Sequence, residues 1–286
     1  MTQGGERKRS SLSHAQEVIR IRKILILSLG LFAVAGSLLL YFLISSRAAQ
    51  EEAESYIDIQ QTYSAVLEYD PPNPEKPLEQ QNTEPSMQLP YITADYTGLR
   101  ELNEDTIGWI AIPGTPISYP VMQSTDNSKY LKRDSSGKKS SAGAVFMDAG
   151  NSLAPLDQNT IIYAHNMGEG REDEMFAPLL LYKEKEHYMA HPYIQFDTHI
   201  EPHGWWEVFA VLHLDLRDDG FNYLRQSFPN PQTFSGWLEQ AQELSLYDTG
   251  VAVCKTDSFL TLSTCDRSLY RGNGRFVLLA AHRGRL

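Results

Sequence analysis

An uninterrupted apolar segment near the N-terminus limits what this chain can be more than any other feature of its sequence. Residues 24–44 read ILILSLGLFAVAGSLLLYFLI, which is 21 residues without a charged side chain. As a helix with a rise of about 1.5 Å per residue, this segment spans about 30 Å, the thickness of a bilayer core. It is longer than the ~7–15-residue apolar region of a cleaved signal sequence, which is the alternative. The segment therefore predicts an uncleaved transmembrane helix.

The charges that flank this segment predict its orientation in a membrane. Before it, basic residues outnumber acidic residues six to two, whereas three glutamates and one arginine occupy residues 45–54. The positive-inside rule then places residues 1–23 in the cytoplasm and everything after residue 44 outside. We therefore expect a single-pass protein of the cell membrane, with the bilayer as one partner and an extracellular C-terminal part.

Composition excludes several classes of protein. The formal net charge is -11 and the pI is near 5.2, which argues against a nucleic-acid partner because a polyanion requires a basic surface. Two cysteines are too few for a disulfide-rich scaffold or a four-cysteine zinc site. A length of 286 residues allows one or two domains.

The segment after the apolar block predicts a spacer. Residues 48–69 are rich in good helix formers, whereas residues 70–90 contain six prolines, which block helices and favour an extended chain. Residues 45–90 are therefore expected to form an extracellular stalk and linker. We place a domain boundary near Tyr91, so that residues 91–286 form one globular domain.

Short apolar runs rich in β-branched and aromatic residues predict a mainly β domain with eight strands. These runs cover Gly108–Ile112, Ile117–Met122, Ala144–Met147, Thr160–Ala164, Tyr193–Thr198, Trp205–Leu214, Ser258–Thr264 and Arg275–Ala281. Eight short strands in a domain of this size favour a closed barrel or a sandwich. Helical patterns are few, namely residues 173–182, residues 183–190 and the stronger one at residues 231–246, which follows the sixth strand and precedes the seventh.

Two residues at the ends of the last strands could carry nucleophilic chemistry. Cys265 ends an apolar run before a polar loop, where a reactive thiolate could be exposed, although a lone cysteine is commonly a small core residue. If the last two strands pair in antiparallel fashion, Arg275 lies about 5 Å from Cys265 and could stabilise a thiolate or an oxyanion. A solvated arginine is the alternative, and Arg267 and Arg271 are rival candidates.

A histidine at a third strand end could serve as the acid and base. His165 follows the run at residues 160–164, where the chain enters a glycine-containing loop. Cysteine and histidine at neighbouring strand ends would form an acyl-transfer constellation, although a histidine at a strand end can also be simply exposed.

The other histidines and the second cysteine predict no further site. The sequence favours neither a metal site nor a cofactor: His187 and His191 have metal-pair spacing, but Pro192 ends any helix there. We expect Cys254 to be unpaired.

Several motifs together resemble those of the sortase family. Residues 261–265 (TLSTC), followed by Arg275 at the start of the last strand, resemble the family's TLxTC…R signature. Residues 163–167 (YAHNM) resemble the stretch that holds the catalytic histidine, and residues 108–115 (GWIAIPGT) and 121–147 are also sortase-like. The N-terminal anchor, the helix expected between the sixth and seventh strands and the lack of a C-terminal anchor point to class B.

The resemblance implies a closed eight-stranded β-barrel and a membrane-anchored cysteine transpeptidase of a Gram-positive type of wall. Cys265 would be the nucleophile, His165 the general acid/base and Arg275 the stabiliser of the substrate carbonyl or oxyanion. The family's substrate contacts map onto Asn127, Leu131, Ser263 and Asp266.

The implied reaction joins a surface protein to the cell wall. Cys265 would cleave a C-terminal sorting signal of the LPxTG or NPxT type after its threonine. The acyl group would then pass to an amine of a peptidoglycan precursor. A pilin-polymerising sortase, a hydrolytic cysteine peptidase and a non-catalytic extracellular binding module remain alternatives.

Overall fold

The computed structural model describes residues 3–67, 89–217, 220–266 and 273–284. The chain divides into two compact units, Met1–Glu52 and Ala53–Leu286. Helix α1 (Gln3–Tyr63) begins in the first unit and its last turns belong to the second. Arg20–Tyr63 of this helix contains a window with a mean hydropathy of 2.4, so it is long and apolar enough to cross a membrane.

The C-terminal turns of α1 pack into the second unit instead of forming a free stalk. Tyr56 and Ile59 are about 95% buried, because each belongs to an apolar cluster of the barrel. The helix ends at Tyr63, short of the expected limit at residue 69. The chain then forms strand β1 (Ser64–Leu67), which pairs in antiparallel fashion with β2 (Tyr91–Ala94). The compact unit therefore starts before the boundary that we expected near Tyr91.

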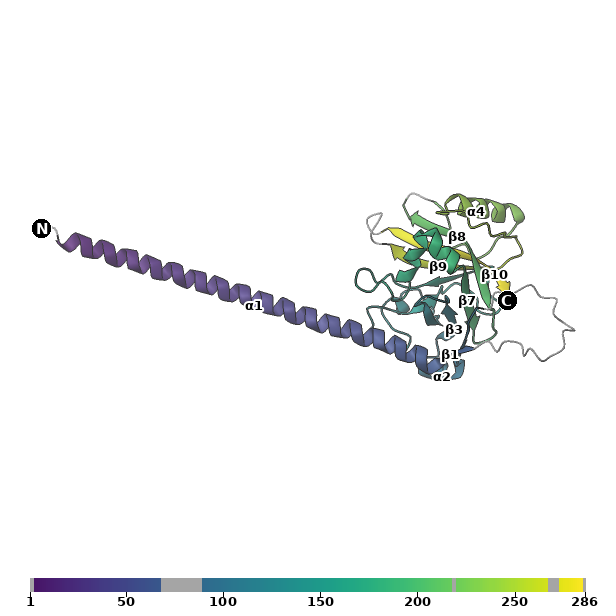
Figure 1. Cartoon of the computed structure of the whole chain (residues 1–286), viewed down its shortest axis with the longest axis horizontal. Coiled ribbons are helices and arrows are strands. Elements are labelled where there is room, and N and C mark those ends of the chain that lie inside the picture. Colours follow the sequence, from purple (N-terminus) through teal and green to yellow (C-terminus); the bar gives the residue numbers. More distant parts are fainter. Residues whose placement is uncertain (1–2, 68–88, 218–219, 267–272, 285–286) are drawn as a thin grey trace. The chain divides into compact units, whose positions relative to one another are not determined.

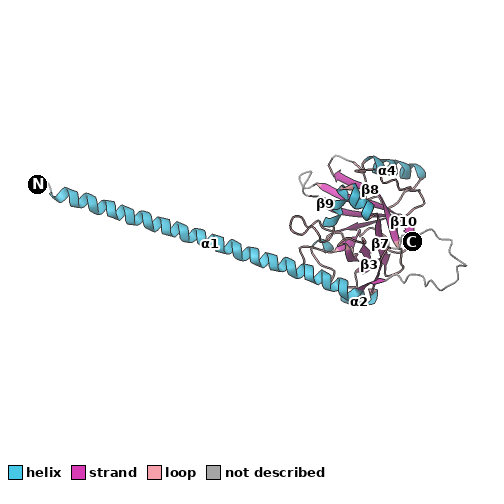
Figure 2. Cartoon of the chain, viewed as in Figure 1, coloured by secondary structure: helices cyan, strands magenta, loops and turns pink. Residues whose placement is uncertain are grey.

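Eight further strands close into a barrel in the order β10-β8-β7-β3-β4-β5-β6-β9, which confirms the fold predicted from the sequence (Figures 1 and 2). Their bounds are β3 Thr106–Ala111, β4 Ser118–Met122, β5 Val145–Met147, β6 Asn159–Tyr163, β7 Tyr193–Thr198, β8 Trp205–Asp215, β9 Phe259–Asp266 and β10 Gly274–Gly284. Most neighbours are antiparallel, but β4–β5 and β6–β9 are parallel.

The two faces of β9 and β10 are both buried, but in different clusters. Leu260, Leu262, Phe276 and Leu278 belong to the cluster that fills the barrel, whereas Phe259 and the alternate residues of β10 face outward. Helix α4 (Pro231–Glu243) packs Phe234 and Trp237 onto this outer face. This helix begins at a proline after the capping residue Asn230, and it lies between the sixth and seventh barrel strands, as predicted.

The remaining helices are short. They are α2 (Tyr96–Leu102), the 3₁₀ turns η1 (Lys129–Leu131) and η2 (Ala177–Lys183), and α3 (Lys185–Ala190). The helix expected over residues 173–182 is thus a 3₁₀ helix that starts later. Its start follows Met175, which has a positive φ of 50° and therefore cannot continue a helix from residue 173.

Candidate active site

The last two strands bring Cys265 and Arg275 together at one end of the barrel. In the antiparallel register of β9 and β10, Cys265 is directly opposite Arg275. Residues opposite each other on such strands lie about 5 Å apart by Cα, so the arrangement expected from the sequence is present. Cys265 is half-buried and free, and the Arg275 guanidinium donates to the Gly274 carbonyl over 3.0 Å.

The parallel neighbour of β9 brings His165 to the same end. Strands β6 and β9 are in register from Asn159↔Phe259 to Tyr163↔Ser263. Two further bonds extend this pairing: the Ala164 amide donates to the Ser263 carbonyl (3.4 Å), and the Thr264 hydroxyl donates to the Ala164 carbonyl (2.8 Å). His165 therefore follows β6 at the level where Cys265 lies on β9.

The three side chains share one face of three adjacent strands. Alternation along a strand places Cys265 on the outer face with Phe259, and Arg275 on the outer face with Val277. His165 has the same alternation relative to Tyr163, the partner of Ser263. Since β6, β9 and β10 are neighbours in the barrel, the cysteine lies between the histidine and the arginine. A thiol, an imidazole and a guanidinium, the groups that an acyl-transfer site combines, thus lie on neighbouring strand ends.

The hydrogen bond of the imidazole indicates which ring nitrogen carries the proton. His165 Nε2 lies 2.8 Å from the Leu131 carbonyl oxygen. A carbonyl accepts hydrogen bonds and cannot donate them, so Nε2 carries the proton in this contact. Nδ1 is therefore the ring nitrogen that can lose and gain a proton during a reaction.

A glycine is required beside this histidine. Gly143 has a φ of 65°, and a Cβ there would lie 2.5 Å from the Tyr130 carbonyl oxygen and 3.1 Å from His165 Cδ2. The glycine thus allows the loop before β5 to lie against the imidazole. Its own carbonyl accepts a hydrogen bond from the Tyr56 hydroxyl of α1.

Two tyrosines near Arg275 were not identified from the sequence. Burial raises the pKa of both Tyr163 and Tyr223, and the positive charge of Arg275 partly offsets that rise. The Tyr163 hydroxyl donates to Asp148 (2.9 Å), and that of Tyr223 lies 3.2 Å from the Ser263 hydroxyl. Tyr163 could have been found from its place two residues before His165 on the same face, whereas Tyr223 lies in a loop without a recognisable pattern.

The four expected substrate contacts differ in their surroundings. Asn127 bridges Asp148 (2.9 Å) and the Ala149 amide (2.8 Å), so it joins the same polar group as Tyr163. Leu131 is 38% exposed next to His165, and Ser263 is buried against Tyr223.

Asp266 lies on the opposite face of β9 from Cys265. Its carboxylate is fully buried, forms an ion pair with Lys183 (2.9 Å) and lies 3.1 Å from the His213 imidazole. This side chain is therefore part of the support under the strand end, where it holds β9 to η2 and β8.

The other reactive residue types have local partners. Cys254 is exposed and unpaired, as expected, and its thiol lies 3.3 Å from Asp257. The rings of His187 and His191 are 4.6 Å apart, and His191 Nδ1 contacts the Pro113 carbonyl. Among the described residues, no group of three or more histidine, cysteine or acidic side chains could hold a metal ion. The rival arginines 267 and 271 lie outside the described residues.

Comparisons with known proteins identify the family of the chain. No protein-family model matches the sequence. Sortase B of Listeria monocytogenes is 37% identical over 180 residues, which is 63% of this chain and 70% of that protein. Sortase B of Staphylococcus aureus is 32% identical over 190 residues, 66% of this chain and 75% of that protein.

A solved structure shows the same architecture. The crystal structure of sortase B from Bacillus anthracis superimposes with a TM-score of 0.65 at 29% identity, and the match covers 84% of this chain and 99% of that one. Identity above 30% across at least 70% of two sortase B sequences is too extensive for a shared fold alone. The chain therefore belongs to the sortase B family of cysteine transpeptidases.

Proposed function

We propose that this protein cleaves a C-terminal sorting signal of the LPxTG or NPxT type after its threonine and transfers the protein to an amine of a peptidoglycan precursor. Cys265 would be the nucleophile, His165 the acid and base, and Arg275 the group that holds the substrate carbonyl. The observation that carries the proposal is the common outer face of β6, β9 and β10, on which Cys265 lies between the other two residues.

The acylation step uses all three residues. The Cys265 thiolate attacks the threonine carbonyl, and a C–S bond forms. Arg275 stabilises the oxygen that becomes negative, an effect worth about 2.7–4 kcal/mol per donor in other acyl-transfer enzymes. The C–N bond to the next residue then breaks, and the leaving amine takes a proton from His165 Nδ1, because Nε2 is held by Leu131.

In the deacylation step, His165 acts as a base instead of an acid. The acceptor amine attacks the thioester carbonyl, and His165 Nδ1 removes its proton. The C–S bond breaks, which releases the product and restores the thiolate and the protonated imidazole. Since both halves pass through a covalent enzyme, the kinetics should be of the ping-pong type.

We also propose that the N-terminus is cytoplasmic and the catalytic unit extracellular. The support is the excess of basic residues before residues 24–44, together with the apolar helix itself. Both cysteines lie beyond this helix, so a membrane-impermeant maleimide should label them on intact cells. Labelling that occurs only after lysis would reverse the orientation.

The reaction can be tested by intact-protein mass spectrometry on the full chain in detergent. The protein is incubated with LPxTG and NPxT peptides, with and without hydroxylamine, beside a Cys265→Ala variant. We expect an acyl adduct or hydroxylaminolysis of one peptide class by the native protein and none by the variant. The variant should keep its unfolding temperature, since it loses one small, half-buried side chain.

Other outcomes would replace the proposal. Peptide cleavage that a supplied amine never intercepts would indicate a hydrolytic peptidase, and a preference for a lysine of a pilin subunit would indicate a polymerising enzyme. A Cys265 that forms no adduct and reacts with electrophiles no faster than Cys254 would indicate a binding module. Full turnover by Cys265→Ala would exclude this nucleophile.

A further inference from the structure

The hydrogen-bond partner of His165 lies on the turn η1, which is held in place by a buried side chain. Leu131 is the last residue of η1, and the preceding residue, Tyr130, is 99% buried. The Tyr130 carbonyl accepts a hydrogen bond from the Ala144 amide (2.9 Å), which ties η1 to the loop that contains Gly143. The position of the Leu131 carbonyl therefore depends on how Tyr130 is held.

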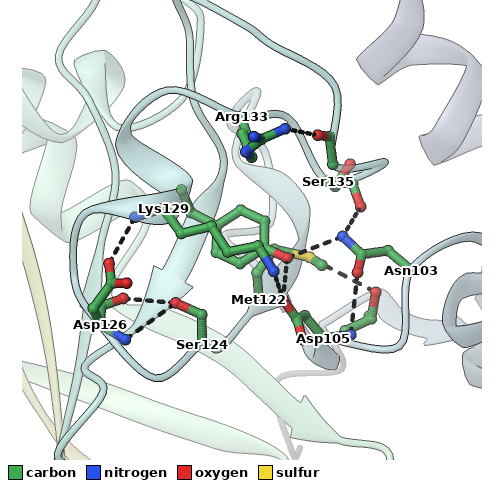
Figure 3. Close-up of polar contacts among 11 residues, drawn as sticks. Asn103, Asp105, Met122, Ser124, Asp126, Lys129, Arg133 and Ser135 are labelled. Carbon is green, nitrogen blue, oxygen red and sulfur yellow. Dashed lines mark hydrogen bonds and ion pairs between the residues drawn. The ribbon is translucent and has the colours of Figure 1, made fainter.

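The phenol of Tyr130 is held by residues from the turn between α2 and β3. Its hydroxyl donates to Asp105 Oδ2 over 2.6 Å and accepts from Asn103 Nδ2 over 3.0 Å. Asn103 also donates to the carbonyl of Ser135 (2.9 Å), which follows η1 in the sequence. Figure 3 shows the side chains of Asn103 and Lys129 beside Asp105.

A charge completes this cluster. The Lys129 ammonium forms an ion pair with the same Asp105 oxygen and lies 5.3 Å from the centre of the Tyr130 ring. Lys129 and Tyr130 are the first two residues of η1, so two of its three residues are tied to one carboxylate. Such a double attachment fixes both the position and the rotation of the turn.

We propose that Asp105 and Tyr130 are positioning residues for the reaction: through η1 they hold the Leu131 carbonyl against His165 Nε2 and thereby keep Nδ1 as the reacting nitrogen. This proposal rests on the role of His165 proposed above. Neither residue touches the substrate or the reacting atoms. Their effect is on the tautomer and orientation of the imidazole, because a carbonyl that moves away no longer favours a proton on Nε2.

The first test measures the tautomer directly. In protein labelled with ¹⁵N-histidine, a ring fixed by Leu131 should show a protonated Nε2 and an unprotonated Nδ1 at alkaline pH, where the imidazole is neutral. The chain contains eight histidines, so the His165 signals are assigned by their loss in His165→Ala. In Tyr130→Phe we expect the His165 signals to shift toward a mixture of both tautomers.

The second test measures turnover by the same variants in the full chain. We expect Tyr130→Phe to lower kcat by between about 10- and 100-fold, as for small misplacements of catalytic groups, with KM for the peptide nearly unchanged. The pH profile of kcat should also shift, because it reports the His165 pKa in the enzyme–substrate complex. Asp105→Asn, which retains an acceptor for the Tyr130 hydroxyl but not the charge, should have a smaller effect on kcat and should serve if Tyr130→Phe does not fold.

A matched control separates positioning from the loss of a partly buried hydrogen bond. The Tyr91 hydroxyl donates to Asp197 over 2.6 Å, the same distance and chemistry, at the β1–β2 ribbon. Tyr91→Phe should leave kcat, the pH profile and the His165 ¹⁵N signals as in the native protein.

Two results would overturn the proposal. One is a native His165 tautomer pattern in both Tyr130→Phe and Asp105→Asn; the other is an equal loss of kcat in Tyr91→Phe. The nuclear magnetic resonance measurement needs no turnover, so it remains informative if no peptide is cleaved. Absence of cleavage by the native protein would instead count against the proposed function.

Discussion

Arg275 lies opposite Cys265 in the β9–β10 register, and its charge acts on the hydroxyls of Tyr163 and Tyr223. A guanidinium can donate to a substrate carbonyl and to a neighbouring group at the same time, because its donors form a planar fork. An ammonium is a point charge on a flexible stem. The identity of the cation therefore matters here beyond its sign.

We predict that Arg275→Lys lowers kcat/KM for a cleaved peptide about 100-fold, similar to the loss of one oxyanion donor elsewhere. The control is Arg283→Lys, on the same strand, where the arginine pairs with Glu207 and Asp257. That variant should retain nearly native kcat/KM. Native rates in Arg275→Lys would assign the stabilising role to another group.

The lowered pKa of Asp105 predicts how the free energy of unfolding depends on pH. Burial acts to raise the pKa of this carboxyl, but hydrogen bonds from Lys129 and Tyr130 outweigh it and hold the pKa below its usual value. A carboxyl whose pKa is lower in the folded than in the unfolded chain stabilises the fold above its unfolded pKa, and this stabilisation disappears as the pH falls through the folded pKa.

Asp105→Asn should therefore lower the free energy of unfolding by about 1–2 kcal/mol at pH 7. The difference from the native protein should shrink below about pH 4, where the unfolded carboxyl is protonated. Urea unfolding, followed by tryptophan fluorescence at several pH values, measures this difference in the free energy of unfolding. A difference that is the same at pH 7 and pH 3 would contradict the assigned charge state.

At the scale of elements, α4 shows how a local sequence signal and tertiary packing combine. Asn230 caps the helix by accepting from the Thr233 amide over 2.8 Å, and Pro231 occupies its first turn. These residues start the helix, but Phe234 and Trp237 place it on the outer face of β8, β9 and β10. The helix thus covers part of the face that carries Cys265 farther along β9.

Asn230→Ala should lower the free energy of unfolding by about 1 kcal/mol, since it removes the cap. Gln240→Ala, at an exposed position of the same helix, should change it by less than about 0.5 kcal/mol. Chemical unfolding of the two variants side by side measures the difference. Equal effects would mean that packing alone defines the start of α4.

At the scale of the whole molecule, the last turns of the apolar helix are part of the catalytic unit. Tyr56 packs edge-on against Tyr119 with ring centroids 5.8 Å apart, and its hydroxyl donates to the carbonyl of Gly143. Gly143 in turn lies against His165. The segment that follows the apolar residues 24–44 therefore contributes to the support of the candidate active site.

Tyr56→Phe should destabilise the catalytic unit by about 1 kcal/mol, the net contribution of one hydrogen bond. Turnover should fall as well, because the support of Gly143 is weakened. Tyr63→Phe is the control, since that ring packs in the cluster of Leu99 and Trp109. Thermal unfolding and peptide cleavage are measured on the full chain; unchanged values in Tyr56→Phe would show that this contact is dispensable.

Much of the architecture follows from local sequence. The eight barrel strands and α4 were predicted close to their observed bounds, because each depends on a run of neighbouring residues with the right periodicity. The apolar segment at residues 24–44 is helical as expected, but it is part of a longer helix, α1 (Gln3–Tyr63). The opposition of Cys265 and Arg275 was also predictable, since one short loop joins their strands. Their roles with His165 remain a prediction.

Other features were decided by tertiary structure. Four of them join residues that are far apart in the chain. They are the parallel pairing of β6 with β9, the burial of Tyr56, the ion pair of Asp266 with Lys183 and the hydrogen bond between Asp105 and Tyr130. No local pattern encodes such contacts, because their energy appears only after the barrel has closed and the partners are desolvated. Local sequence patterns thus define which strands form and which of them end near Cys265, His165 and Arg275, whereas closure of the barrel defines which side chains support these residues.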